Sequence, residues 1–89
     1  MATKIKWSSL DYATRDALSE LMEKTGASYR EMEDMAKGEI TYSRIRDIKM
    51  GNKAPARLSE FTTICRICGQ NPVPIFQKIV NTPNSKPTK

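Results

Sequence analysis

Two cysteines three positions apart, Cys65 and Cys68, are the first candidates for chemistry in this sequence. A Cys-x-x-Cys pair can bind zinc or exchange disulfides, but a zinc site needs four ligands, and the chain has no other cysteine and no histidine. A thioredoxin-like motif would follow a strand, and no strand pattern is visible. We therefore expect both sulfurs to pack on the apolar side of a helix. A metal or disulfide bridge between two chains is the alternative.

A second candidate is the acidic cluster of Glu31, Glu33 and Asp34. Positions 31 and 34 share a helix face and could be mistaken for a metal site, but acids on a helix surface are usually solvated. The chain also lacks histidine and any glycine-rich phosphate loop. The sequence therefore predicts no enzyme activity, no cofactor and no metal.

The third candidate is the polar and cationic face of a short helix at residues 41–51. Thr41 can cap this helix, Ile45 and Ile48 face inward, and Gly51 closes it. A short, well-supported helix with polar, aromatic and cationic groups on its outer side suits a DNA groove. Arg44 and Lys49 flank its apolar side, and its outward positions are Tyr42, Ser43, Arg46, Asp47 and Met50.

Another helix must lie just before this one, because residues 28–38 carry complete start and stop signals. Ser28 and Glu31 have the spacing of a capping box. Lys37 and Gly38 supply a cation and a left-handed residue at the end. The apolar side of this helix is predicted to consist of Met32, Met35 and Ala36.

Three further helices complete an all-α prediction, with one domain at residues 8–80. The first runs from Ser8 or Ser9 to about Thr25, and the fourth from Leu58 to Gly69, with a short final helix from Ile75 after a rigid connector at residues 71–74. The first helix has an apolar stripe of Leu10, Ala13, Ala17, Leu18 and Leu21; that of the fourth is Leu58, Phe61, Ile64, Cys65 and Cys68.

The two ends of the chain have a different composition. Residues 1–7 are predicted to form a flexible basic arm with Trp7 docking its end, and residues 81–89 a disordered tail. No apolar run approaches the length of a bilayer span, and the N-terminus lacks the apolar core of a signal peptide. A cytoplasmic protein without a membrane partner is expected.

Charge is distributed unevenly along the chain, whose net charge is +5. Residues 1–39 hold eight acids and six bases, whereas residues 40–89 hold two acids and nine bases. A basic second half is typical of a face turned toward a polyanion, although a solvated lysine-rich surface is the other interpretation.

Residues 17–76 resemble the lambda-repressor-like helix-turn-helix family, which includes phage repressors and Cro-type proteins. The resemblance implies a five-helix fold and double-stranded DNA as the partner. It also implies a nucleoid-associated protein in the cytoplasm of a bacterial or phage-infected host cell. This sequence departs from the family in a second helix and turn that are one or two residues longer. A bulky or charged residue near Glu33 replaces the usual small one, and the loop before Leu58 has one extra residue at Arg57. The matching positions are Leu18, Leu21, Gly26, Ser28, Ile40, Thr41, Ile45, Ile48, Gly51, Pro55, Leu58, Phe61, Ile64, Cys65, Gly69, Ile75 and Phe76.

The resemblance also implies a division of contacts on DNA. Tyr42, Ser43 and Arg46 would contact base edges. A larger group would contact phosphates and fix the register. Its members are Tyr29, Arg30, Thr41, Lys49, Asn52, Lys53 and Arg57.

These observations predict a transcriptional regulator, a phage-type repressor or Cro-like protein that blocks a promoter sterically. An antitoxin of the same fold, a protein-interaction adaptor, and a redox or metal sensor are the alternatives. A weak homodimer, formed on DNA, is predicted through the final helix, because one recognition helix reads few base pairs. Its interface would draw on Ile75, Phe76, Ile79 and Val80, with Ile75 and Ile79 able to pack inward.

Overall fold

A computed structural model describes residues 6–81, and within that range the chain forms five helices and no strand. The all-α prediction is confirmed for this part of the chain. Most of the predicted arm and tail lies outside the described residues. The helices are α1 (Ser9–Thr25), α2 (Tyr29–Met35), α3 (Tyr42–Met50), α4 (Leu58–Ile67) and α5 (Pro72–Asn81).

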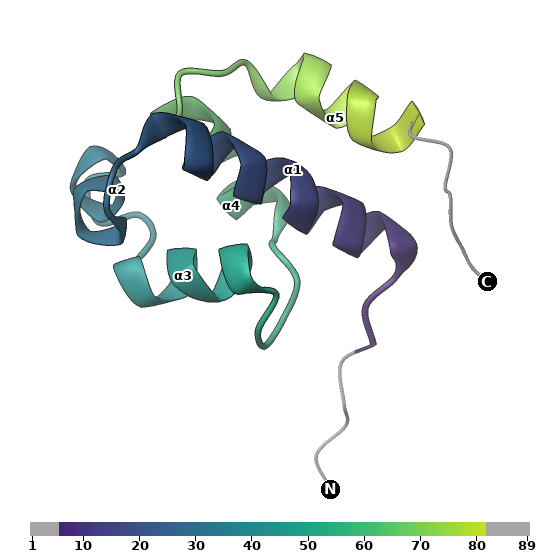
Figure 1. Cartoon of the computed structure of the whole chain (residues 1–89), viewed down its shortest axis with the longest axis horizontal. Coiled ribbons are helices and arrows are strands. Elements are labelled where there is room, and N and C mark those ends of the chain that lie inside the picture. The colour runs from purple at the N-terminus through teal and green to yellow at the C-terminus, as the bar shows by residue number, and fades with distance from the viewer. Residues whose placement is uncertain (1–5, 82–89) are drawn as a thin grey trace, which may run out of the picture.

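Helix α1 is the element around which the others are arranged. It packs against α3, α4 and α5, while α2 packs against α3. In Figure 1 it crosses the middle of the molecule, with α5 along one side and α3 along the other. The Ser8 hydroxyl accepts the Asp11 N–H and the Asp11 carboxylate accepts the Ser8 N–H, so a capping box starts α1. The left-handed Gly26 ends it at φ 70°.

The core lies where α1, α3 and α4 meet. Leu18, Ile45, Ile64 and Cys65 are fully buried there, which confirms the inward faces predicted for these three helices. Burying such side chains contributes about 1.5–3 kcal/mol each. The remaining buried apolar residues are Met22, Met32, Ala36, Ile40, Ile48, Phe61 and Ile79.

Three residues predicted on apolar faces are exposed instead. Leu58 is 70% exposed because it is the first residue of α4, where side chains tilt back past the helix end. Met35 is 45% exposed, since α2 stops there and the chain turns at Ala36. Leu10, in the first turn of α1, is also 45% exposed.

The segment predicted as a rigid connector is the start of α5. Pro72 and Pro74 both lie in its first turn, where the missing N–H removes no helical hydrogen bond. The Asn71 side chain accepts the N–H of Val73 at 2.9 Å. Helix α5 is therefore longer than predicted and starts three residues earlier.

The turn between α2 and α3 holds two consecutive left-handed residues, Lys37 at φ 55° and Gly38 at φ 78°. Helix α2 ends at Met35 with Ala36 as its cap, two residues before the predicted end. The capping box of Ser28 and Glu31 at its start is confirmed. The turn leads into Ile40, whose burial anchors the entry to α3.

Candidate nucleic-acid interface

Helix α3 begins and ends as its sequence predicts. The Thr41 hydroxyl accepts the N–H of Arg44 at 3.3 Å, and Gly51 closes the helix at φ 76°. A Cβ at position 51 would lie 2.7 Å from Nη1 of Arg15, so a side chain there would be strained and would displace that guanidinium. Arg15 thus places a cation from α1 beside the C-terminal end of α3, where a helix favours positive charge.

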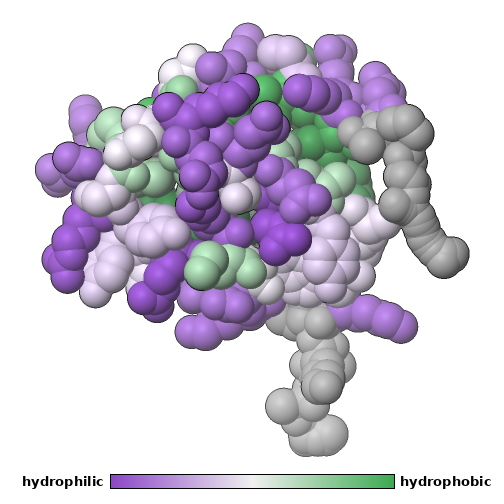
Figure 2. Space-filling view, viewed as in Figure 1, coloured by the Kyte–Doolittle hydropathy of each residue, from purple (hydrophilic) through white to green (hydrophobic). Residues whose placement is uncertain are grey.

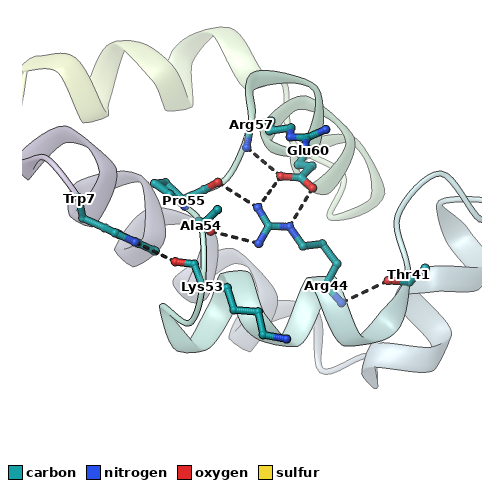
Figure 3. Close-up of polar contacts among 8 residues, drawn as sticks. All are labelled: Trp7, Thr41, Arg44, Lys53, Ala54, Pro55, Arg57 and Glu60. Atoms are coloured by element: carbon teal, nitrogen blue, oxygen red, sulfur yellow. Dashed lines mark hydrogen bonds and ion pairs between the residues drawn. The ribbon is translucent and has the colours of Figure 1, made fainter. Parts of the chain in front are cut away.

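The Arg44 guanidinium ties α3 to the segment that follows it (Figure 3). It donates to both carboxylate oxygens of Glu60, at 2.9 and 2.8 Å, and to the carbonyls of Ala54 and Pro55, at 3.1 and 2.9 Å. A planar fork of this kind suits a carboxylate and two carbonyls at once. The bond from Arg44 holds the pKa of Glu60 below its usual value, against the opposing effect of burial.

A second bond fixes the same segment from the N-terminal side. The indole N–H of Trp7 donates to the carbonyl of Lys53 at 3.0 Å, and the Trp7 ring lies 5.1 Å from that of Tyr12 on α1. Lys53 adopts a left-handed backbone at φ 60°, uncommon for a residue with a side chain. The docking of Trp7 predicted from the sequence has a defined acceptor on the loop at residues 51–57 (Figure 3).

The turn before α3 is held by α4. The carboxylate of Glu39 accepts from the Thr63 hydroxyl at 3.4 Å and from the Arg66 guanidinium at 3.2 Å. The turn before α3 and the first turn of α3 are therefore both tied to residues of α4, one through Glu39 and one through Arg44. This support makes the outer side of α3 a fixed surface.

That outer side carries Ser43, Arg46 and Met50, all exposed. Between residues 6 and 81, Arg46 has no hydrogen bond or ion pair, although it lies only two residues from the fully bonded Arg44. Residues two apart on a helix point in different directions, so the same short helix presents one anchored and one free guanidinium. A free, exposed fork can pair with two acceptors on a base edge.

Tyr42 lies at the α2 side of this surface. The guanidinium of Arg30, from α2, stacks over its ring at 4.4 Å from the ring centre. The ring is half-buried while Arg30 is exposed. The structure thus brings Arg30, Tyr42, Ser43 and Arg46 to one continuous part of the surface formed by α2 and α3.

The other residues predicted to contact phosphates differ in their exposure and in their internal contacts. Asn52 and Arg57 are exposed on the loop after α3, and the Lys53 side chain is 77% exposed. Thr41 uses its hydroxyl as the α3 cap, and Tyr29 packs beside the core. Lys49 donates to Glu23 on α1, a bond that raises the pKa of Lys49, and only 21% of its side chain is exposed.

One residue predicted to point outward is buried. Asp47 is 7% exposed, and its carboxylate faces Lys53 on the loop that Arg44 and Trp7 hold in place. The Lys53 Nζ lies 3.6 Å from its carboxylate. Asp47 therefore does not belong to the outward-facing residues of the predicted interface.

The anchoring pair of Arg44 and Glu60 was not identified from the sequence as part of this site. The sequence predicts Arg44 only as a flank of the apolar side of its helix. The sequence does hold a signal for Glu60, which stands three residues after the N-cap Arg57, the spacing of a capping box, and accepts the Arg57 N–H at 2.8 Å. Nothing in that spacing identifies the distant Arg44 as its ionic partner.

Helix α5 divides the four residues predicted at a dimer interface. Ile79 is 5% exposed and Ile75 packs against the core, so both belong to the monomer. Phe76 and Val80 are 45% and 52% exposed, and Val73, which was not predicted, is 61% exposed. Figure 2 shows hydrophobic residues gathering where α5 runs beside α1, on an otherwise largely hydrophilic face.

The two cysteines are packed rather than poised for chemistry. Cys65 is fully buried, and burial raises the pKa of its thiol to about 11; burial also raises the pKa of Cys68. Both are therefore thiols at neutral pH, a form that neither attacks disulfides nor binds metal well. Within the described range, no three histidine, cysteine or acidic residues are grouped to hold a metal ion.

Comparisons with known proteins add no relative: no family model, curated protein or solved structure matches the chain. Among residues 6–81, no helix has the length and apolar character needed to cross a bilayer.

Proposed function

We propose that this protein is a sequence-specific double-stranded DNA-binding regulator with a helix-turn-helix formed by α2 and α3. In this role it acts as a phage-type repressor or a Cro-like protein that blocks a promoter sterically. Arg46 and Ser43 read base edges, Tyr42 packs on a base or bonds a phosphate, and Arg30, Asn52, Lys53 and Arg57 contact the backbone.

The observation that carries this proposal is Arg46, which has no hydrogen bond or ion pair with any described residue, although the helix that carries it is fixed at both of its connections. Internal hydrogen bonds hold the turn before α3, its cap and the loop after it. Because the backbone that carries Arg46 is already ordered, binding restricts the Arg46 side chain but need not order the helix as well, which favours a specific contact over a diffuse one. We do not include Lys49 among the proposed DNA contacts, because its ammonium already donates to Glu23.

A homodimer belongs to the same proposal, with a revised interface. Val73, Phe76 and Val80 lie at spacings of three and four residues, so they share one face of α5 and are exposed. Two copies joined there would place two α3 helices on one duplex and double the number of bases read. Ile79 is excluded from this interface by its burial.

The test is selection of bound duplexes from a random pool, followed by the salt dependence of the winning sequence. We expect one enriched motif, with affinity that falls steeply as salt rises because phosphate contacts release counterions. A two-fold symmetric motif that Val80→Asp reduces to a half-site, without loss of folding, would support the dimer. No enrichment together with salt-independent binding would contradict the proposal.

The alternative classes give different results in the same assay. An adaptor would bind no duplex and would instead hold a protein partner, whereas an antitoxin would bind both DNA and a partner protein. The exposed apolar face of α5 is available for either kind of partner, so Val80→Asp should weaken protein binding in both classes. Duplex binding, which only the antitoxin would show, separates the two classes.

A further inference from the structure

The buried carboxylate of Asp47 is a charged group that the proposed DNA contacts do not use. Its side chain is 10% exposed. Over the described residues, no N–H or O–H donates a hydrogen bond to it, and its ion-pair partner is the Lys53 ammonium at 3.6 Å, which is beyond hydrogen-bond distance. Glu60, the other acid after residue 40, is fully bonded by comparison.

The position of Asp47 is electrostatically costly. It lies in the C-terminal half of α3, where the helix dipole disfavours negative charge. Burial without hydrogen bonds adds a further cost. Its charge is balanced by two nearby cations, since it also helps to raise the pKa of Arg44 and pairs with Lys53. Arg44 is committed to Glu60 and to two carbonyls, so Lys53 is the cation that can still move.

The Lys53 side chain therefore has two possible negative partners. It is 77% exposed, on a loop whose backbone is fixed by Trp7 and Arg44, and its flexible stem can swing between the carboxylate and the solvent. A DNA phosphate reaching this loop would compete with Asp47 for the same ammonium. A contact between Lys53 and a phosphate would therefore remove the mobile positive charge that lies beside the buried carboxylate of Asp47.

We propose that Asp47 limits the affinity of the α3 surface for DNA by competing with phosphate for Lys53. This inference rests on the proposed function, because it assumes that the loop after α3 meets a phosphate backbone. The competition applies to any duplex sequence, so its effect is to lower binding to random DNA and leave discrimination to Arg46.

Replacing Asp47 tests the competition. Asp47→Asn keeps the shape and removes the charge, and we expect its affinity for a random-sequence duplex at low salt to rise about fivefold. Glu20→Gln is the matched control, because Glu20 pairs with Lys24 at 3.8 Å on the exposed side of α1 and carries the same charge. This control should change affinity by less than about twofold. An equal gain in both variants, or no gain in Asp47→Asn, would overturn the proposal.

Lys53→Met shows whether the effect passes through Lys53. Combined with Asp47→Asn, it should abolish most of the gain, since phosphate and carboxylate would have no ammonium to share. A gain that persists in full in the double variant would mean that Asp47 acts through the general field, and would overturn the competition. Thermal unfolding by circular dichroism must show that each variant is folded at the assay temperature.

A measurement on the unaltered chain covers the case in which Asp47→Asn fails to fold. The carbon resonance of the Asp47 carboxylate should shift when duplex is added, because its counter-charge leaves, while that of Glu60 should not. An unchanged Asp47 resonance in a protein that binds duplex would overturn this inference alone. Absence of duplex binding would overturn it together with the proposed function.

Discussion

Arg44 and Arg46 occupy the same turn of the same helix but have opposite environments. Arg44 makes four internal hydrogen bonds, to Glu60 and to two loop carbonyls, whereas Arg46 makes none among residues 6–81. The first is 21% exposed along its side chain, and the second projects into solvent. The Arg44 guanidinium fixes α3 to α4 and to the loop after α3, and this support holds the Arg46 guanidinium at the surface.

This difference separates two uses of positive charge that composition alone cannot separate. The basic second half of the chain predicts a surface for a polyanion. Two of its cations, however, form internal ion pairs: Arg44 with Glu60, and Lys49 with Glu23. The net charge of a segment therefore overstates the charge available to a partner. Which cations remain available depends on where the acids of other helices lie.

The largest effect should come from removing the anchored arginine. Arg44→Met removes the guanidinium donors of Glu60 and of two carbonyls, and we expect the free energy of unfolding to fall by about 2–4 kcal/mol. Urea unfolding monitored by circular dichroism measures it. Arg46→Met is the matched control and should change stability by less than about 0.5 kcal/mol. An equal loss in the free energy of unfolding of the two variants would contradict the structural role assigned to Arg44 and not to Arg46.

The free arginine should matter for binding instead. Arg46→Ala should weaken the complex with the selected duplex by about 1–3 kcal/mol and the complex with random DNA by less, because a bidentate base contact is lost. Competition titrations with both duplexes provide the comparison. If the two complexes weaken equally, Arg46 contacts only the backbone and the base-reading role is wrong.

Thr41 is predicted both to support the fold, as the cap of α3, and to contact DNA. Its hydroxyl caps α3 by accepting the Arg44 N–H, so Thr41→Ala should lower stability by about 1 kcal/mol. Thr41→Ser keeps the hydroxyl and should retain most of that stability. A variant that loses DNA affinity without losing stability would assign Thr41 to the binding side.

The smallest effect concerns pH. Because Arg44 lowers the pKa of Glu60 in the folded chain, the pair stabilises the fold fully above the pKa of the unfolded carboxyl. That contribution is lost as pH falls through the lower folded pKa, so the difference in stability between the native chain and Glu60→Gln should narrow below about pH 4. A difference that is constant from pH 7 to pH 3 would show that the charge of Glu60 is not what matters.

The helices and caps were predictable because their signals are local. Ser28 with Glu31, Thr41 and Gly51 each act within a few residues of the helix end they define, and all three ends were placed correctly. Met35 and Leu58 fit the apolar period of their helices but lie at helix ends and are exposed, and the two prolines of the predicted connector begin α5. A period identifies a face, but it does not say where neighbouring helices stop covering that face.

The site was less predictable because its supports join distant positions. The partner of Arg44 is 16 residues away, and the acceptor of Trp7 is 46 residues away. Lys53, the ion-pair partner of Asp47, lies on the loop that those same contacts hold from α3 and from the N-terminal segment. No spacing rule within one helix could have supplied these pairs.

The placement of Trp7 gives the chain a built-in optical reporter. It is the only tryptophan, so ultraviolet emission beyond the tyrosine range comes from one indole whose N–H is bonded to the loop after α3. Release of that indole into water would move its emission to longer wavelength, even while the helices stay intact. Fluorescence and circular dichroism followed on one sample would thus time two separate events, the lifting of the N-terminal segment and the melting of the core.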